Sequence, residues 1–148
     1  MSYLRPLSTS RDGIMDNRPA GLDRPLNGKR VLLVDDDAEL ITVLRAYLED
    51  QGLMITEAGT ARQALHVLHD RGPYDLVLLD IGLPDTDGLD VLERLRREGY
   101  DRPVIMTTAD SASVKVWRAR QLGAAAYLTK PFEFDRLMQF MTQILAAS

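Results

Sequence analysis

The chain has 148 residues, a formal net charge of -4 and a hydrophobic content of 45%. This length suits one domain with its own core and is short for two. The acidic balance argues against nucleic acid as the main partner, and no apolar run reaches the roughly 20 residues needed to cross a bilayer. The sequence contains no cysteine, which excludes disulfides and thiolate metal sites and is compatible with a reducing compartment. We therefore expect a soluble, cytoplasmic protein.

The first 27 residues differ in composition from the rest of the chain. They contain four Arg, three Asp and three Pro, with scattered apolar residues and no helical or strand period. Such a segment buries too little surface to offset the entropy lost on ordering. We predict a flexible N-terminal extension over 1–27 and a single folded domain over 28–148.

Short apolar runs alternate with amphipathic segments through the rest of the chain. The apolar runs predict strands that are buried on both faces, and the amphipathic segments predict helices. Asp37 suits the N-cap of the first helix, and Thr60 with Gln63 has capping-box spacing at the start of the second. The expected strands are 31–34, 53–58, 76–80, 104–107 and 124–128; the expected helices are 38–50, 61–71, 89–98, 111–122 and 134–145.

This order of elements predicts the fold class. Five repeats of strand and helix favour an α/β fold with one parallel sheet and right-handed crossovers. The expected strand order is 2-1-3-4-5, that of the flavodoxin-like doubly wound (βα)5 fold. In that order the first strand lies beside the third.

The chemistry follows from where the strands end. Asp35 and Asp36 close the first strand and Asp80 closes the third, so the three carboxylates should meet at one edge of the sheet, near Thr108 and Lys130. At about 4 Å and an effective dielectric of about 20, each pair of carboxylates repels by roughly 4 kcal/mol. Oxygen ligands of this kind favour Mg²⁺. A carboxylate beside Mg²⁺ and a lysine can attack phosphorus, because the cations offset the charge of the phosphoryl donor.

Four segments resemble the receiver domain of two-component response regulators, of the chemotaxis-regulator kind. They read V-L-L-V-D-D-D at 31–37, Y-D-L-V-L-L-D-I-G-L-P-D-T-D-G-L at 74–89, P-V-I-M-T-T-A at 103–109 and G-A-A-A-Y-L-T-K-P-F at 123–132. The resemblance runs from about residue 28 to the C-terminus, and the motifs are specific in combination.

The resemblance implies a phosphoacceptor site. Asp80 would take a phosphoryl group from a histidine kinase or a phosphotransfer protein. Asp36, Asp80 and the backbone carbonyl of Gly82 would hold Mg²⁺, and Asp35 would reach the ion directly or through water. The domain would then be a signalling protein that catalyses only its own phosphoryl transfer and hydrolysis.

The resemblance also implies a switch. Thr108 would bond a phosphoryl oxygen, and Lys130, followed by a cis bond to Pro131, would pair with the phosphate. Tyr127 would swing inward as Thr108 moves. If the active arrangement gains roughly 3 kcal/mol, its population relative to the inactive one rises about 150-fold. The face formed by the fourth helix, fifth strand and last helix would then change and be read by a downstream protein target.

Two positions depart from the family pattern. Gly82 stands where a bulkier residue is common, which would leave the site open to water. Asp110 lies two residues after Thr108, where a carboxylate could position a hydrolytic water. We therefore expect a short-lived phosphoryl-aspartate.

Several other side chains are candidates for less specific roles. His66 and His69 have i, i+3 spacing, but the polar side of a helix is a better interpretation than a metal site. Arg94, Arg96 and Arg97 are expected to form a solvated helix end that faces the negative pole of the helix dipole.

Trp117 and Thr107 each allow a plain structural interpretation. Trp117 could anchor a partner or pack the fourth helix against the sheet, and the sequence leaves both open. Thr107 is expected to be an ordinary strand residue.

Two other functions remain possible on the sequence alone. A phosphatase of the haloacid-dehalogenase type also uses an aspartate nucleophile, and Asp35-Asp36-Asp37 contains its D-x-D pattern, but that class puts the nucleophile on the first strand and needs a longer chain. A receiver-shaped interaction module that works without phosphorylation is the second alternative. The sequence also leaves open whether the chain acts alone or is part of a longer regulator.

Overall fold

A computed structural model describes residues 26–110 and 113–146 of the chain. Strands and helices alternate from the first element to the last. None of the helices in this described part is long and apolar enough to cross a membrane. The elements are β1 Arg30–Val34, α1 Ala38–Asp50, β2 Met54–Ala58, α2 Ala61–Arg71, β3 Leu76–Asp80, α3 Gly88–Arg97, β4 Val104–Thr108, α4 Ser113–Gln121, β5 Ala126–Thr129 and α5 Phe134–Ala146.

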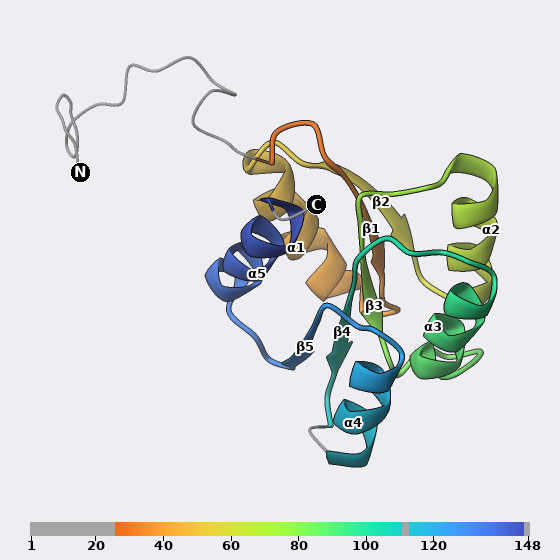
Figure 1. The fold of residues 1–148 in the computed structure, drawn as a ribbon. Coiled ribbons are helices and arrows are strands. Elements are labelled where there is room, and N and C mark those ends of the chain that lie inside the picture. Colours follow the sequence, from red (N-terminus) through yellow and green to blue (C-terminus); the bar gives the residue numbers. More distant parts are fainter. Residues whose placement is uncertain (1–25, 111–112, 147–148) are drawn as a thin grey trace, which may run out of the picture.

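The five strands form one parallel sheet in the order β2-β1-β3-β4-β5. This confirms the predicted α/β class and the predicted strand order. Helices α1 and α5 cover one face of the sheet, and α2, α3 and α4 lie on the other (Figure 1). Both faces are therefore covered, which explains why the strands read as continuous apolar runs.

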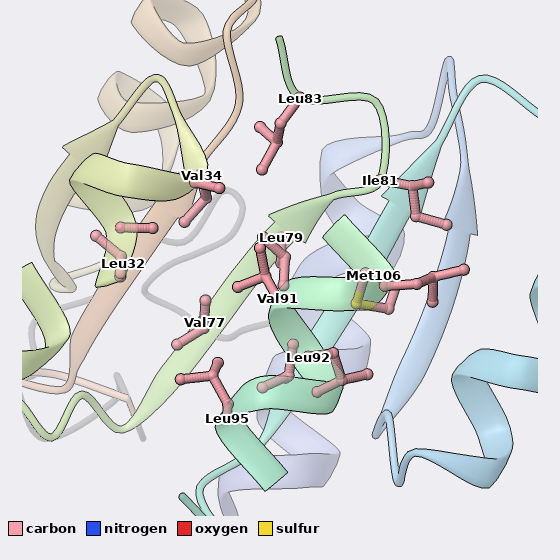
Figure 2. Packing of buried hydrophobic residues seen from close by; sticks show 14 of the residues in the cluster. Leu32, Val34, Val77, Leu79, Ile81, Leu83, Val91, Leu92, Leu95 and Met106 are labelled. Carbon is pink, nitrogen blue, oxygen red and sulfur yellow. The ribbon is translucent and has the colours of Figure 1, made fainter. Parts of the chain in front are cut away.

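Two hydrophobic clusters lie on the two faces of the sheet. Alternate strand residues contribute to each, so Leu32 packs towards α2 and α3 whereas Leu33 packs towards α1 and α5. Figure 2 shows the first cluster, in which Leu92 and Leu95 of α3 lie against Val77 and the residues around it. Because they are buried on both faces, the central strands are rigid, and the residues at their carboxyl ends are held in fixed positions.

The predicted caps are present. The Asp37 carboxylate accepts the N–H of Leu40 at 3.1 Å, and the Thr60 hydroxyl accepts the N–H of Gln63 at 3.0 Å. The Gln63 side chain in turn accepts the N–H of Gly59 at 2.8 Å, one residue earlier than a capping box requires. Helices α1 and α2 therefore begin where the sequence pattern placed them.

Some boundaries differ from the prediction. Leu26 is buried against the α1 and α5 side of the core, so the folded domain begins before Gly28, and only residues 1–25 of the predicted extension lie outside the described part. The fifth strand begins at Ala126 rather than Ala124, because the N–H of Ala124 donates to Ala119 and closes α4. The predicted start of α4 at 111–112 also lies outside the described residues.

Arg96 is not part of a solvated helix end, so that prediction was wrong for this residue. Its half-buried guanidinium donates to the carbonyls of Leu122, Gly123 and Tyr100 at 2.6–3.1 Å. Burial lowers the pKa of Arg96, an effect that the charges of nearby groups oppose. The side chain ties the end of α3 to the turn that follows α4, a long-range role that local sequence does not reveal.

Candidate functional site

Three acidic side chains meet at the carboxyl edge of the sheet. Asp35 follows β1, and its N–H donates to Ala58 at the end of β2. Asp80 is the last residue of β3, where the register pairs it with Thr107 of β4. Asp35, Asp36 and Asp80 can each offer a carboxylate oxygen such that the three oxygens lie within 4.8 Å of one another. The convergence predicted from the strand order is confirmed.

Lys130 is the cation of this cluster. Its ammonium nitrogen lies 2.7 Å from Oδ2 of Asp35 and 3.3 Å from Oδ1 of Asp80. The backbone N–H of Lys130 donates to the carbonyl of Thr108 at 2.7 Å, which fixes where the side chain starts. The bond from Lys130 to Pro131 is cis, as the resemblance implied. Lysine and carboxylates are thus brought together from β1, β3 and the end of β5.

The charges at the site are unbalanced. Burial raises the pKa of the Asp80 carboxyl, and the charge of Asp35 raises it further, while Lys130 opposes both effects. Burial lowers the pKa of Lys130, but its hydrogen bond to Asp35 and the charges of Asp80 and Asp35 outweigh this and leave the pKa raised. Burial therefore dominates the shift of Asp80, whereas the neighbouring carboxylates Asp35 and Asp80 dominate that of Lys130.

The backbone after Asp80 is tightly packed. A side chain on Gly88, the first residue of α3, would bring its Cβ to 2.2 Å from the carbonyl oxygen of Asp80. Glycine is therefore required at position 88 for α3 to lie against the end of β3. At Gly82 the nearest atom to such a Cβ is Oδ2 of Asp80 at 3.7 Å, an ordinary contact, so the position is open.

The residues present fit a divalent cation. All three side chains offer hard oxygen ligands, Asp36 is exposed, and the cluster carries more negative charge than Lys130 balances. Both oxygens of Asp35 already have partners, because Oδ1 accepts the N–H of Asp37 at 2.9 Å and Oδ2 faces Lys130. The carboxylate of Asp35 is therefore held by the chain itself.

The two threonines at the end of β4 have different surroundings. The Thr107 hydroxyl is directed at Oδ1 of Asp80, at 3.5 Å. The Thr108 hydroxyl instead accepts the N–H of Asp110 at 3.0 Å. Thr107 is a residue of β4, as expected, and its hydroxyl in addition lies near the Asp80 carboxylate. Sequence reasoning missed this contact because the register that pairs Asp80 with Thr107 cannot be read from either strand alone.

Thr108 is joined to Tyr127. The phenol of Tyr127 donates to the backbone carbonyl of Asp110 at 3.0 Å, and burial raises its pKa while a hydrogen bond with Thr108 opposes the rise. The Asp110 carboxylate lies 3.6 Å from the ammonium of Lys115 at the start of α4. Thr108 and Tyr127 are thus both bonded to the backbone of Asp110.

Helix α4 exposes two large apolar side chains. Val114 is 75% exposed and Trp117 is 63% exposed, so Trp117 does not pack α4 against the sheet. Arg118 turns the other way and donates to Asp90 at 2.7 Å and to Glu93 at 2.8 Å, both on α3.

The two histidines lie on the polar side of α2, as expected. His66 and His69 are both exposed, and His66 pairs with Asp70 at 3.1 Å. Within the described ranges, the group of side chains that could hold a metal ion is the acidic cluster.

A family model described as the response regulator receiver domain matches residues 31–142. The curated relatives include the transcriptional regulatory protein CpxR of Escherichia coli (strain K12), which is 40% identical over 80% of this chain and 50% of its own length. The two-component response regulator ARR11 of Arabidopsis thaliana is 38% identical over 80% of this chain and 23% of its own length. The chain spans about half or less of the length of these relatives.

Solved structures agree with the family model. A CheY-like response regulator receiver domain protein from Methanospirillum hungatei superimposes with a TM-score of 0.77 at 29% identity, covering 82% of this chain and 96% of that one. The response regulator TrrA from Thermotoga maritima, crystallised in complex with Mg²⁺-BeF, gives a TM-score of 0.70 at 33% identity, covering 78% and 98%. These findings do not favour the phosphatase of haloacid-dehalogenase type or the phosphorylation-independent module.

The raised pKa of Asp80 predicts that its charge destabilises the metal-free protein. The folded-state pKa lies above the unfolded one, so the carboxyl costs no stability while it is protonated in both states, and a penalty develops as pH rises from the unfolded pKa through the folded one. Asp80→Asn should therefore raise the melting temperature at pH 7 in EDTA, by about 4 °C for each kcal/mol recovered, and the gain should vanish in acid. Circular dichroism melts provide the measurement.

The matched control for this experiment is Asp50→Asn, an exposed position at the end of α1. It should leave the melting temperature unchanged. A lower melting temperature for Asp80→Asn than for the wild type at pH 7 would contradict the electrostatic account.

Proposed function

The chain belongs to the response regulator receiver family, and on that premise we propose that Asp80 is its phosphoacceptor. The observation that carries the proposal is the position of the Asp80 carboxylate, 4% exposed at the end of β3 and 3.3 Å from the Lys130 ammonium. The donor would be a phosphohistidine of a histidine kinase or of a phosphotransfer protein. The protein would act as a signalling domain that transfers and hydrolyses only its own phosphoryl group.

The reaction is a phosphoryl transfer to a carboxylate. An oxygen of Asp80 forms a bond to phosphorus as the bond from phosphorus to the donor nitrogen breaks, and the electron pair of that bond leaves with the imidazole. Mg²⁺ would be held by Asp36, Asp80 and the Gly82 carbonyl, with Asp35 reaching it directly or through water, and would supply charge neutralisation. The ammonium of Lys130 would move from the carboxylates to the phosphoryl oxygens, where its positive charge would offset their negative charge.

The switch follows from the hydroxyl of Thr108. In the structure described here, this hydroxyl accepts the N–H of Asp110 and is hydrogen-bonded to Tyr127. A phosphoryl group on Asp80 offers new acceptor oxygens, so Thr108 would exchange its partner for one of them. The contact of Tyr127 with the loop at Asp110 would change with it, and the loop leads directly into α4.

The output would be read by a protein. We propose that the face of α4, β5 and α5 contacts a downstream target, with Val114 and Trp117 as apolar anchors. The net charge of -4 does not favour direct nucleic-acid contact by this domain. A histidine kinase draws on cytoplasmic ATP, so the proposal also places the domain in the cytoplasm.

A pull-down with and without beryllofluoride, repeated with Trp117→Ala, tests the target contact.

Incubation with acetyl phosphate and Mg²⁺ should add one phosphoryl group, visible by intact-mass spectrometry. Asp80→Asn should abolish this uptake, because the amide is not a nucleophile for phosphorus, whereas the exposed control Asp50→Asn should retain it. Omission of Mg²⁺ should reduce uptake strongly. Uptake that survives Asp80→Asn and maps to Asp35 would instead support the phosphatase alternative.

The open site around Gly82 and the carboxylate of Asp110 predict rapid loss of the phosphoryl group. Position 82 has room for a side chain, so Gly82→Met should shield Asp80 from water. Asp110→Asn should remove a candidate base. Each should lengthen the half-life by about threefold or more. Decay is followed by intact mass after removal of acetyl phosphate. A wild-type phosphoryl group that persists for many hours would refute the expectation.

Trp117 is the only tryptophan in the chain and reports on α4 without interference. If the switch reaches α4, addition of Mg²⁺ and beryllofluoride should shift the emission of Trp117. Thr108→Ala should bind beryllofluoride but give a much smaller shift, because the connection to Tyr127 is lost. An equal shift in Thr108→Ala and wild type would show that α4 responds by another route.

A further inference from the structure

A buried hydroxyl lies against the phosphoacceptor without a place in the function described above. Thr107 is 2% exposed, and its hydroxyl lies 3.5 Å from Oδ1 of Asp80. The contact is fixed by the backbone, since Thr107 and Asp80 are partners in the β3–β4 register and the N–H of Ile81 donates to the carbonyl of Thr107 at 2.8 Å. Leu78 and Ile105, two residues before Asp80 and Thr107, lie in the same core cluster, so Asp80 and Thr107 face the same side of the sheet.

The Asp80 carboxylate has two other partners besides the Thr107 hydroxyl. Oδ1 also faces the Lys130 ammonium at 3.3 Å, and a backbone hydrogen bond from Gly82 lowers the pKa of the carboxyl against the effect of burial. Lys130 must move when a phosphoryl group arrives, because it would then pair with the phosphate. Thr107 is buried, and its backbone is paired with that of Asp80, so the position of its side chain beside Asp80 does not depend on where Lys130 moves.

We propose that Thr107 is a positioning residue for phosphoryl uptake: its hydroxyl donates to Oδ1 of Asp80 and restricts rotation of the carboxylate, so that an oxygen points at the incoming phosphorus. The proposal rests on Asp80 as the phosphoacceptor. Phosphoryl transfer passes through a loose transition state, so its rate depends mainly on positioning and on stabilisation of charge. The small loss of nucleophilicity caused by one donated hydrogen bond should therefore matter less than the gain in orientation.

A pair of substitutions separates this role from simple packing. Thr107→Val keeps the volume and removes the hydroxyl, whereas Thr107→Ser keeps the hydroxyl and removes a methyl group. If the hydroxyl positions Asp80, Val slows uptake and Ser restores it. If Thr107 only fills space, Val is harmless and Ser, which leaves a small cavity, is the more damaging change.

The experiment measures the initial rate of phosphoryl uptake from saturating acetyl phosphate and Mg²⁺, by intact mass, in wild type, Thr107→Val, Thr107→Ser and Asp80→Asn. We expect about a fivefold loss of rate for Val, in line with one modest hydrogen bond, and near wild-type uptake for Ser. Circular dichroism melts of each variant report whether the fold is intact.

Each outcome has one meaning. Equal rates for Val and wild type, or a larger loss for Ser than for Val, would overturn the role of Thr107 while Asp80 stands. Uptake in Asp80→Asn equal to that of wild type would overturn the proposed function itself. If Thr107→Val melts far below wild type, the same comparison is made with Thr107→Ser and Thr107→Ala, which differ only in the hydroxyl, and equal rates there would also overturn the proposal.

Discussion

The site depends on the side-by-side pairing of β1, β3 and β4 in one parallel register. That pairing is fixed by backbone hydrogen bonds and by apolar side chains on both faces of the sheet. It forces Asp35 and Asp80 to end at the same edge, where their charges repel and cannot relax by moving apart. The position of Lys130 between them and the fit of the acidic cluster to a divalent cation both follow from this enforced proximity.

A rigid edge of this kind suits a reversible phosphoryl group. The strands cannot yield, so a change of charge at Asp80 must be absorbed by the side chains and loops around it. Lys130 contacts the carboxylates and donates its backbone N–H to Thr108, and both Thr108 and Tyr127 bond the backbone of Asp110. In contrast, Arg118 holds α4 against α3 through two carboxylates, which opposes any displacement of that helix. The balance between these two connections would set how far α4 moves.

The close contacts around Asp80 differ in what they tolerate. Gly88 has no space for a side chain, whereas Gly82 has. Glycine at position 88 is therefore needed for α3 to pack against the end of β3. The residue at position 82 can vary in size, and its size would determine how much water reaches Asp80. Thr107 resembles Gly88 in this respect, because its place beside Asp80 is set by the register of β3 and β4.

Much of this protein follows from the sequence alone. The alternation of apolar runs and amphipathic segments predicted the α/β class and the strand order, and aspartates at strand ends predicted the acidic cluster, because both depend on local period and on the geometry common to parallel sheets. The tertiary structure alone decided which of two adjacent threonines faces Asp80, where the Arg96 side chain ends and that Trp117 points to solvent. These depend on the register between strands and on contacts between residues more than 20 positions apart, which no local pattern encodes.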